Sequence, residues 1–141
     1  MYASNVTASG SLAMMTPGSR YTFCDQPPNR PSVAESVMRY AVQLARTSRP
    51  SGENPPDFIK QYVNYGASLR ASQFLILGGK ARALINGRYN VAVEDIQALA
   101  YPVFRHRILA NFHAESEGIK TEEIIRRLIE VVPVPQSGLK E

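Results

Sequence analysis

The sequence predicts an all-α fold, a small bundle of about five helices, on three observations. Apolar residues recur with the 3.6-residue period of amphipathic helices, and no stretch alternates convincingly as a strand would. Residues that favour helix starts and stops separate these periodic segments. The chain has 141 residues, of which 44% are hydrophobic, and this is enough for a single core.

Composition predicts how the chain is organised. Residues 1–31 are rich in Ser, Thr, Gly, Pro and Asn without a sustained period, so we expect a flexible leader there. The helical domain is expected over residues 32–135. A short tail follows over residues 136–141.

The first helix is expected just after Pro31. Ser32 and Glu35 have the spacing of a capping box, in which each of the two side chains accepts the backbone N–H of the other residue. The residues that share one helical face are Val33, Val37, Tyr40, Ala41 and Leu44. Prolines and a glycine within residues 50–56 end this helix and form a loop.

Two helices are expected next. The first covers about residues 57–65 and is ended by Gly66 in the left-handed conformation. The second covers about residues 69–86, with Ser68 as its cap and Gly87 directly after it. Its predicted core stripe is Ala71, Phe74, Leu75, Gly78, Ala81, Leu84 and Ile85.

The same helix contains Gly-Gly-Lys, which is part of the pattern of a phosphate-binding loop. That pattern also needs a glycine where Phe74 stands and a hydroxyl where Ala81 stands, so we do not expect a nucleotide loop here. Because glycine destabilises a helix interior, Gly78 is expected to admit a close neighbouring helix. Gly79 and Lys80 are expected to lie off the buried stripe, with Lys80 in solvent.

The remaining helices follow from residue 93. Glu94 and Asp95 suit the positive end of a helix dipole, and Pro102 should bend or split the helix that they begin. Its two expected inner faces are Ile96, Leu99 and Ala100, then Phe104, Ile108 and Phe112. Gly118 ends this run, and Thr121 caps a last helix whose inner residues are Ile124, Leu128, Val131 and Val132.

Most catalytic and membrane functions find no support in the sequence. His106 and His113 lack the spacing of metal ligands, and no nucleophile, zinc or ATPase acid motif occurs, so no catalytic or metal residue is predicted. The one cysteine, Cys24, excludes an internal disulfide. No apolar run reaches the ~20 residues of a membrane helix and no secretory signal is recognisable, so we expect a cytoplasmic protein without a membrane partner.

The net charge of +4 permits weak attraction to phosphates or acidic proteins. The densest basic groups are Arg105-His106-Arg107 and Arg126-Arg127, shorter than the stripe of most nucleic-acid binders. Nucleic acid is therefore not the expected partner. The Arg105-His106-Arg107 group is a candidate partner contact or a helix cap, and both interpretations stay open.

Arg70 is placed unusually for a purely structural residue. It falls in the first turn of the expected third helix, where a cation opposes the helix dipole by about 0.3–1 kcal/mol. Two interpretations follow from this position alone. Arg70 is a surface arginine whose charge water screens, or it forms an anion site with the free N–H groups of the helix start.

Several ordered motifs resemble one family. Residues 66–108, "GASLRASQFLILGGKARALINGRYNVAVEDIQALAYPVFRHRI", are similar to the C-terminal lid of MoxR-type AAA+ ATPases, and "VMRYAVQLARTSRP" (residues 37–50) is similar to that family's helix ending in a Thr-Arg element. The matching motifs are Gly66-Ala67-Ser68-Leu69-Arg70-Ala71, Gly87-Arg88, Glu94-Asp95 and Phe104-Arg105-His106-Arg107. The likeness covers roughly residues 32–135.

This resemblance implies that Arg70 is the sensor-2 arginine, which reaches nucleotide phosphates, with Ser68 and Ala71 shaping the helix start. It implies ATP and Mg²⁺ only together with a separate ATPase core, because this chain carries no Walker A or Walker B motif and is not expected to hydrolyse ATP alone. The implied partners are an AAA+ core or neighbouring subunits of a chaperone-like ring, and a protein with a von Willebrand A-type domain. Leu69 and Phe104 depart from the family's proline and leucine.

Two alternatives belong to other classes of function. The chain could be a stand-alone interaction module that has kept the helical bundle and lost the nucleotide role. It could also be a small nucleic-acid-binding bundle, with Arg105, Arg107, Arg126 and Arg127 on the contact face.

Overall fold

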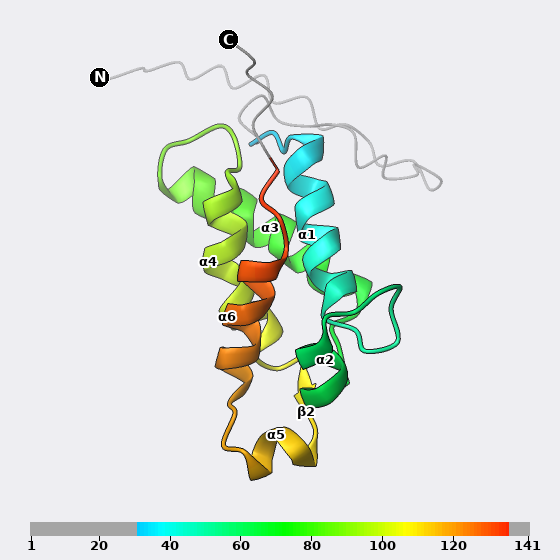
Figure 1. Ribbon diagram of the computed structural model, residues 1–141. Helices are drawn as coiled ribbons and strands as arrows, with labels where there is room; N and C mark the ends of the chain where they lie inside the picture. The colour runs from blue at the N-terminus through cyan, green and yellow to red at the C-terminus, as the bar shows by residue number, and fades with distance from the viewer. Residues whose placement is uncertain (1–30, 136–141) are drawn as a thin grey trace, which may run out of the picture.

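The computed structural model describes residues 31–135, which form six helices and one short two-stranded sheet (Figure 1). The elements are α1 (Glu35–Thr47), α2 (Asp57–Tyr62), β1 (Val63–Tyr65), α3 (Leu69–Ile85), α4 (Val93–Phe104), β2 (Leu109–Ala110), α5 (Phe112–Ser116) and α6 (Thr121–Val131). The predicted all-α class is confirmed. The expected leader lies outside the described residues except for Pro31. The expected tail and Cys24 also lie outside them.

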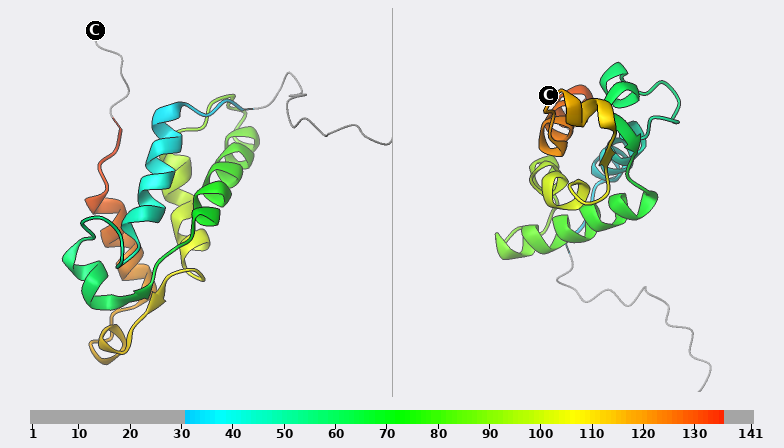
Figure 2. Two further views of the ribbon diagram at one scale, coloured as in Figure 1. Left: turned by 90° about the vertical axis from the view of Figure 1, so that its right-hand side faces the viewer. Right: turned by 90° about the horizontal axis from the view of Figure 1, so that it is seen from below.

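Helices α1, α3 and α4 lie side by side and form most of the bundle (Figures 1 and 2). Helix α6 packs against α4 and α1, while α2, the β1–β2 pair and α5 form one end of the domain. Large side chains that are completely or almost completely buried come from every long helix: Tyr40, Leu44, Leu75, Ile96, Phe104, Ile124, Ile125 and Leu128. One contiguous core therefore fixes how the ends of these helices are placed.

The start of α1 differs from the expected capping box. Helix α1 begins at Glu35, and Ala34 takes the cap position without a side-chain hydrogen bond. Ser32 lies instead in an extended segment, where its backbone N–H donates to the carbonyl of Tyr89 at 2.8 Å and its hydroxyl donates to the side chain of Asn90. The prediction was wrong because Ser32 has this long-range partner, which the local pattern does not contain.

Helix α2 is shorter than expected because the chain turns extended at Val63. Strand β1 pairs antiparallel with β2, Val63 opposite Ala110, with a bulge before Tyr65. Gly66 does not take the left-handed conformation that we expected. Among the described residues, the glycines with positive φ are Gly87 (67°) and Gly118 (71°), both at helix ends as predicted.

Helix α3 has nearly the expected bounds but buries a different face. Its buried residues are Ala71, Ser72, Leu75, Gly79 and Ala83. Four residues of the predicted stripe are exposed: Phe74 (47%), Leu84 (50%), Ile85 (85%) and Ala81. The helix is apolar on nearly every side, so its periodicity alone could not identify the face that packs.

Both central glycines of α3 meet neighbouring side chains. A Cβ on Gly78 would lie 2.9 Å from Leu99 Cδ1 of α4, which confirms the expected close approach. A Cβ on Gly79 would lie 2.9 Å from Val91 Cγ1. Gly79 is thus part of the buried face, and its expected position off the stripe was wrong.

The region after α4 is less helical than predicted. Helix α4 continues through Pro102 and ends at Phe104, and the short strand β2 follows. Phe104 and Ile108 are buried as expected, whereas Phe112 is 83% exposed because it begins a separate helix, α5. In α6, Thr121 is the first helical residue rather than the cap. Ile124, Leu128 and Val132 are buried as predicted, whereas Val131, at the end of the helix, is 52% exposed, contrary to the prediction.

Candidate functional site

The candidate site is the turn of residues 66–71, which leads from β1 into α3. Gly66 packs directly against the backbone at the end of α1: a Cβ there would lie 2.2 Å from the carbonyl oxygen of Ser48 and 2.6 Å from Cα of Arg49. No side chain fits at such distances, so glycine is required by close approach rather than by its φ angle.

Hydrogen bonds hold the same turn against α1. The N–H of Ala67 donates to Ser48 Oγ at 2.9 Å, and Ser48 Oγ donates in turn to the carbonyl of Ala45 at 2.8 Å. Nε of Arg49 donates to the carbonyl of Ala67 at 2.8 Å. Ser48 and Ala67 are completely buried, so the two bonds of Ser48 Oγ are shielded from competing water, whereas the bond from Arg49 is partly buried.

The predicted neighbours of Arg70 lie in this turn. Ser68 is the cap residue of α3, as expected, but its side chain makes no capping hydrogen bond; its carbonyl accepts the N–H of Ala71 at 2.9 Å. Ala71 is completely buried against the core. Ser68 and Ala71 thus shape the helix start through backbone and packing.

Arg70 itself is exposed in the first turn of α3. Within residues 31–135 its side chain has no hydrogen-bond or ion-pair partner. Every other arginine of that range has one: Arg39, Arg46, Arg49, Arg82, Arg88, Arg105, Arg107, Arg126 and Arg127. An arginine beside a helix N-terminus offers two kinds of donor to an anion, its guanidinium and the free backbone N–H groups.

The face of α3 that carries Arg70 continues as an exposed apolar stripe. Leu77 and Leu84 follow Arg70 at intervals of seven residues, or about two helical turns, and are 61% and 50% exposed. A groove of about 570 Å³ runs beside them, lined by Pro31, Gln73, Ile76, Leu77, Lys80, Ala81 and Leu84. Exposed apolar surface of this kind is typical of a protein contact.

The Arg105-His106-Arg107 group lies at the end of α4. Nε of Arg105 is 3.1 Å from Glu122 Oε1 of α6. Arg107 donates to the carbonyl of Val103 at 2.8 Å, and its guanidinium carbon is 4.8 Å from the ring centre of Phe74 on α3. Both arginines therefore join the end of α4 to its neighbours, while His106 is exposed.

The second basic group is neutralised locally. Glu123 accepts hydrogen bonds from both Arg126 and Arg127, and these lower the pKa of its carboxyl group to about 2. Arg126 also pairs with Glu130 at 2.9 Å. Because glutamates offset these arginines, this face presents less positive charge than the sequence suggests.

The Gly87-Arg88 and Glu94-Asp95 motifs are visible in the sequence, but their contact in the fold was not predicted. Arg88 donates to Asp95 Oδ1 at 2.6 Å, Arg82 lies 3.3 Å from the same oxygen, and the N–H of Ala92 donates to Oδ2 at 3.0 Å. Asp95 is 1% exposed. Burial would raise its pKa, but the hydrogen bonds and positive charges outweigh burial and lower it. The pair fastens the loop between α3 and α4.

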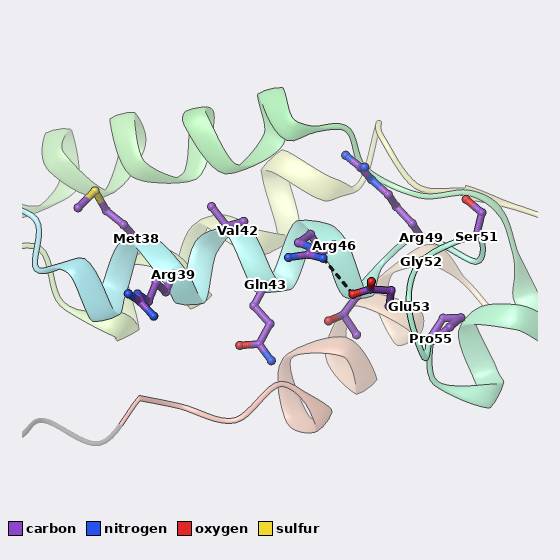
Figure 3. A pocket seen from close by; sticks show the side chains of 11 residues that line it. Met38, Arg39, Val42, Gln43, Arg46, Arg49, Ser51, Gly52, Glu53 and Pro55 are labelled. Carbon is purple, nitrogen blue, oxygen red and sulfur yellow. Dashed lines mark hydrogen bonds and ion pairs between the residues drawn. The ribbon is translucent and has the colours of Figure 1, made fainter.

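A second groove, of about 700 Å³, lies on the outer face of α1 and the loop after it (Figure 3). The ion pair between Arg46 and Glu53, 3.4 Å apart, crosses its wall. Arg49 lies at its edge and points toward the chain leading into α3 (Figure 3). The groove does not include Arg70.

Residues 31–135 contain neither a metal-ligand cluster nor a membrane-spanning helix. No three His, Cys, Asp or Glu side chains gather there as a metal site would require. No helix in that range combines the length and apolarity needed to cross a bilayer.

Residues 58–128 match the AAA lid domain, and the chain belongs to this family. Its relatives place it with the C-terminal lids of MoxR-type AAA+ ATPases. It is 30% identical over 104 residues to the chaperone MoxR1 of Mycobacterium tuberculosis, a match that covers 74% of this chain and 28% of MoxR1. It is 33% identical over 101 residues to the uncharacterised protein YeaC of Bacillus subtilis, covering 72% of this chain and 29% of YeaC.

A solved structure of a proposed ATPase from Cytophaga hutchinsonii has the same fold in its matching part, with a TM-score of 0.71 and 36% identity. That match covers 77% of this chain and 33% of the ATPase. The chain thus spans about a third or less of the proteins it resembles, and it corresponds to their lid rather than to a whole ATPase.

Proposed function

We propose that this lid serves a MoxR-type AAA+ ATPase in the cytoplasm, with Arg70 as the sensor-2 arginine that contacts the nucleotide phosphates. The observation that carries the proposal is the state of Arg70: exposed, without a partner in residues 31–135, and set at the start of α3 by a buried turn. The turn fixes the backbone from which Arg70 projects, and a guanidinium without a competing partner is available to stabilise phosphate charge.

The nucleotide itself would be bound mainly by an ATPase core. ATP and Mg²⁺ would occupy that core, and Arg70 would reach the phosphates when the lid closes over it. The exposed stripe of Leu77 and Leu84 continues the face of Arg70 and supports docking on a protein surface. The partners would be an AAA+ core, neighbouring subunits of a chaperone-like ring, and a protein with a von Willebrand A-type domain.

Two parts of the proposal concern other residues. Ser68 and Ala71 would position the helix start rather than bind nucleotide through their side chains. Arg105, His106 and Arg107 remain candidate partner contacts, and His106 is exposed. The chain alone would not hydrolyse ATP.

ATP turnover tests this function once a core is supplied. The full chain would be fused to the core of the Cytophaga ATPase in place of the region that it matches. Arg70→Ala should lower kcat/KM for ATP by about 10- to 100-fold, the scale of hydrogen bonds to charged groups. Arg39→Ala is the matched control, because Arg39 is an exposed arginine paired with Glu35 on another helix. Equal turnover by the Arg70→Ala variant and the parent would refute the proposal.

A further inference from the structure

The end of α1 and the start of α3 form one hydrogen-bonded unit, although 18 positions separate Arg49 from Ala67 in the sequence. Both backbone groups of Ala67 are used: its N–H donates to Ser48 Oγ and its carbonyl accepts from Arg49 Nε. Gly66 leaves no gap against the backbone of Ser48. The turn is thereby fixed in position and in orientation.

We infer that Ser48 and Arg49 are positioning residues for Arg70. This inference rests on the proposed function, since the role of Arg70 comes from it. Neither residue would touch the nucleotide in this account. They would set the direction in which α3 leaves the turn and so the place from which the Arg70 side chain reaches out.

The geometry gives this effect a physical basis. Arg70 follows Ala67 by three residues, and the hydrogen bond from Ala71 N–H to Ser68 O closes the first helical turn around Arg70. A change in the Ala67 peptide plane therefore rotates the first turn of α3 as a unit. A long side chain amplifies that rotation, and displacements of about 1 Å are enough to impair phosphate contacts.

The contacts also link α1 to the site. Ser48 is the residue that ends α1, and its hydroxyl bridges Ala45 on that helix to Ala67 on the turn. Arg49 reaches the turn from the edge of the groove on α1 (Figure 3). A movement of α1 would thus be transmitted to Arg70 through two side chains.

Hydrogen exchange on the full chain tests the geometric half of the inference. Ser48→Ala removes the acceptor of the Ala67 N–H, and the exchange of that amide should accelerate about tenfold or more while amides in the middle of α4 stay protected. Arg46→Leu is the matched control, because Arg46 lies nearby on α1 but pairs with exposed Glu53. Unchanged exchange at Ala67 would overturn the inference.

A double-mutant cycle on the chain fused to an ATPase core tests the functional half. Arg49→Leu should lower kcat/KM for ATP about tenfold when Arg70 is present and less than twofold in the Arg70→Ala background. Arg49→Lys should recover most of the loss, because an ammonium group can still donate to the Ala67 carbonyl.

The outcomes separate the two proposals. If Arg70→Ala impairs turnover but Arg49→Leu lowers it by the same factor in both backgrounds, Arg49 has only a structural role and the inference is wrong. If Arg49→Leu leaves kcat/KM unchanged when Arg70 is present, although Arg70→Ala impairs turnover, the inference is also wrong. If Arg70→Ala itself has no effect, the proposed function fails and the inference falls with it.

Discussion

Gly66→Ala is the substitution that most directly tests how the turn is held. The new Cβ would lie 2.2 Å from the carbonyl oxygen and 2.5 Å from the carbonyl carbon of Ser48, both backbone atoms that cannot rotate away. The backbone on one side must therefore move. Such a movement would also strain the hydrogen bonds of 2.9 Å and 2.8 Å that hold Ala67.

The magnitude follows from these two effects. Overpacking in a tight site costs about 1–3 kcal/mol, and a buried hydrogen-bonding group that loses its partner costs a further 1–3 kcal/mol or so. We therefore expect Gly66→Ala to lower the free energy of unfolding by about 3 kcal/mol or more. For a domain of this size, that corresponds to a Tm lower by roughly 12–24 °C.

Thermal unfolding followed by circular dichroism measures this shift. Gly78→Ala is the matched control, because the Cβ there meets only the flexible side chain of Leu99, whose Cδ1 would lie 2.9 Å away. Its strain is offset by the better helix propensity of alanine, worth about 1 kcal/mol, so its Tm should stay within about 4 °C of the parent. A Gly66→Ala variant that melts as late as Gly78→Ala would refute the close packing of the turn.

Three further predictions concern other parts of the domain. Asp95→Asn should destabilise the protein at pH 7 and have a smaller effect in acid. Folding lowers the pKa of Asp95, so the stability that its carboxylate contributes is complete above the ordinary pKa of ~3.9 and is lost as the pH falls from there through the lowered pKa. Urea unfolding at pH 7, 5 and 3 measures this dependence. An unchanged difference between variant and parent at pH 3 would contradict this. Tyr62→Phe should lower the free energy of unfolding by about 0.5–1.5 kcal/mol, because it removes the 2.7 Å hydrogen bond to Glu117 that joins α2 to the end of α5. Denaturant titration measures this free energy, and Phe112→Ala, which changes an exposed side chain, should have no comparable effect. Leu77→Ser should leave the Tm within about 2 °C, since Leu77 is 61% exposed, but weaken binding of the chain to a lidless core in a pull-down or by light scattering; equal binding would argue against the α3 stripe as the docking face.

The sequence was most informative where local chemistry decides the structure. Helix ends marked by Gly87 and Gly118 were predicted correctly, because a left-handed residue after a helix favours glycine whatever surrounds it. The inner face of α1 was also predicted, since its polar and apolar residues segregate clearly. The predicted bounds of α3 were nearly right because Gly87 marks the end of this helix.

Features that depend on distant contacts were missed. Ser32 caps nothing because it pairs with Asn90, and Gly66 is required by the backbone of Ser48, 18 residues earlier. The buried face of α3 was misplaced because the helix is apolar nearly all round. Neither a local pattern nor a hydrophobic period contains such information.

The candidate site shows the same division. Arg70 could be selected from the sequence because its position in a helix start is unusual for a cation and because the surrounding motif resembles a known lid. Ser48 and Arg49 could not be assigned to that site from their own residue types. Only the fold shows that the end of α1 meets the turn before Arg70.

Calorimetric titration of Mg²⁺–ATPγS tests the central claim most directly. The full chain alone should give no binding heat, and the chain fused to an ATPase core should bind saturably, with an affinity that Arg70→Ala lowers about tenfold or more. Saturable binding by the chain alone that disappears with Arg70→Ala would mean a self-sufficient nucleotide site and would contradict the lid account. Equal affinity of the fused parent and its Arg70→Ala variant would contradict the assignment of Arg70.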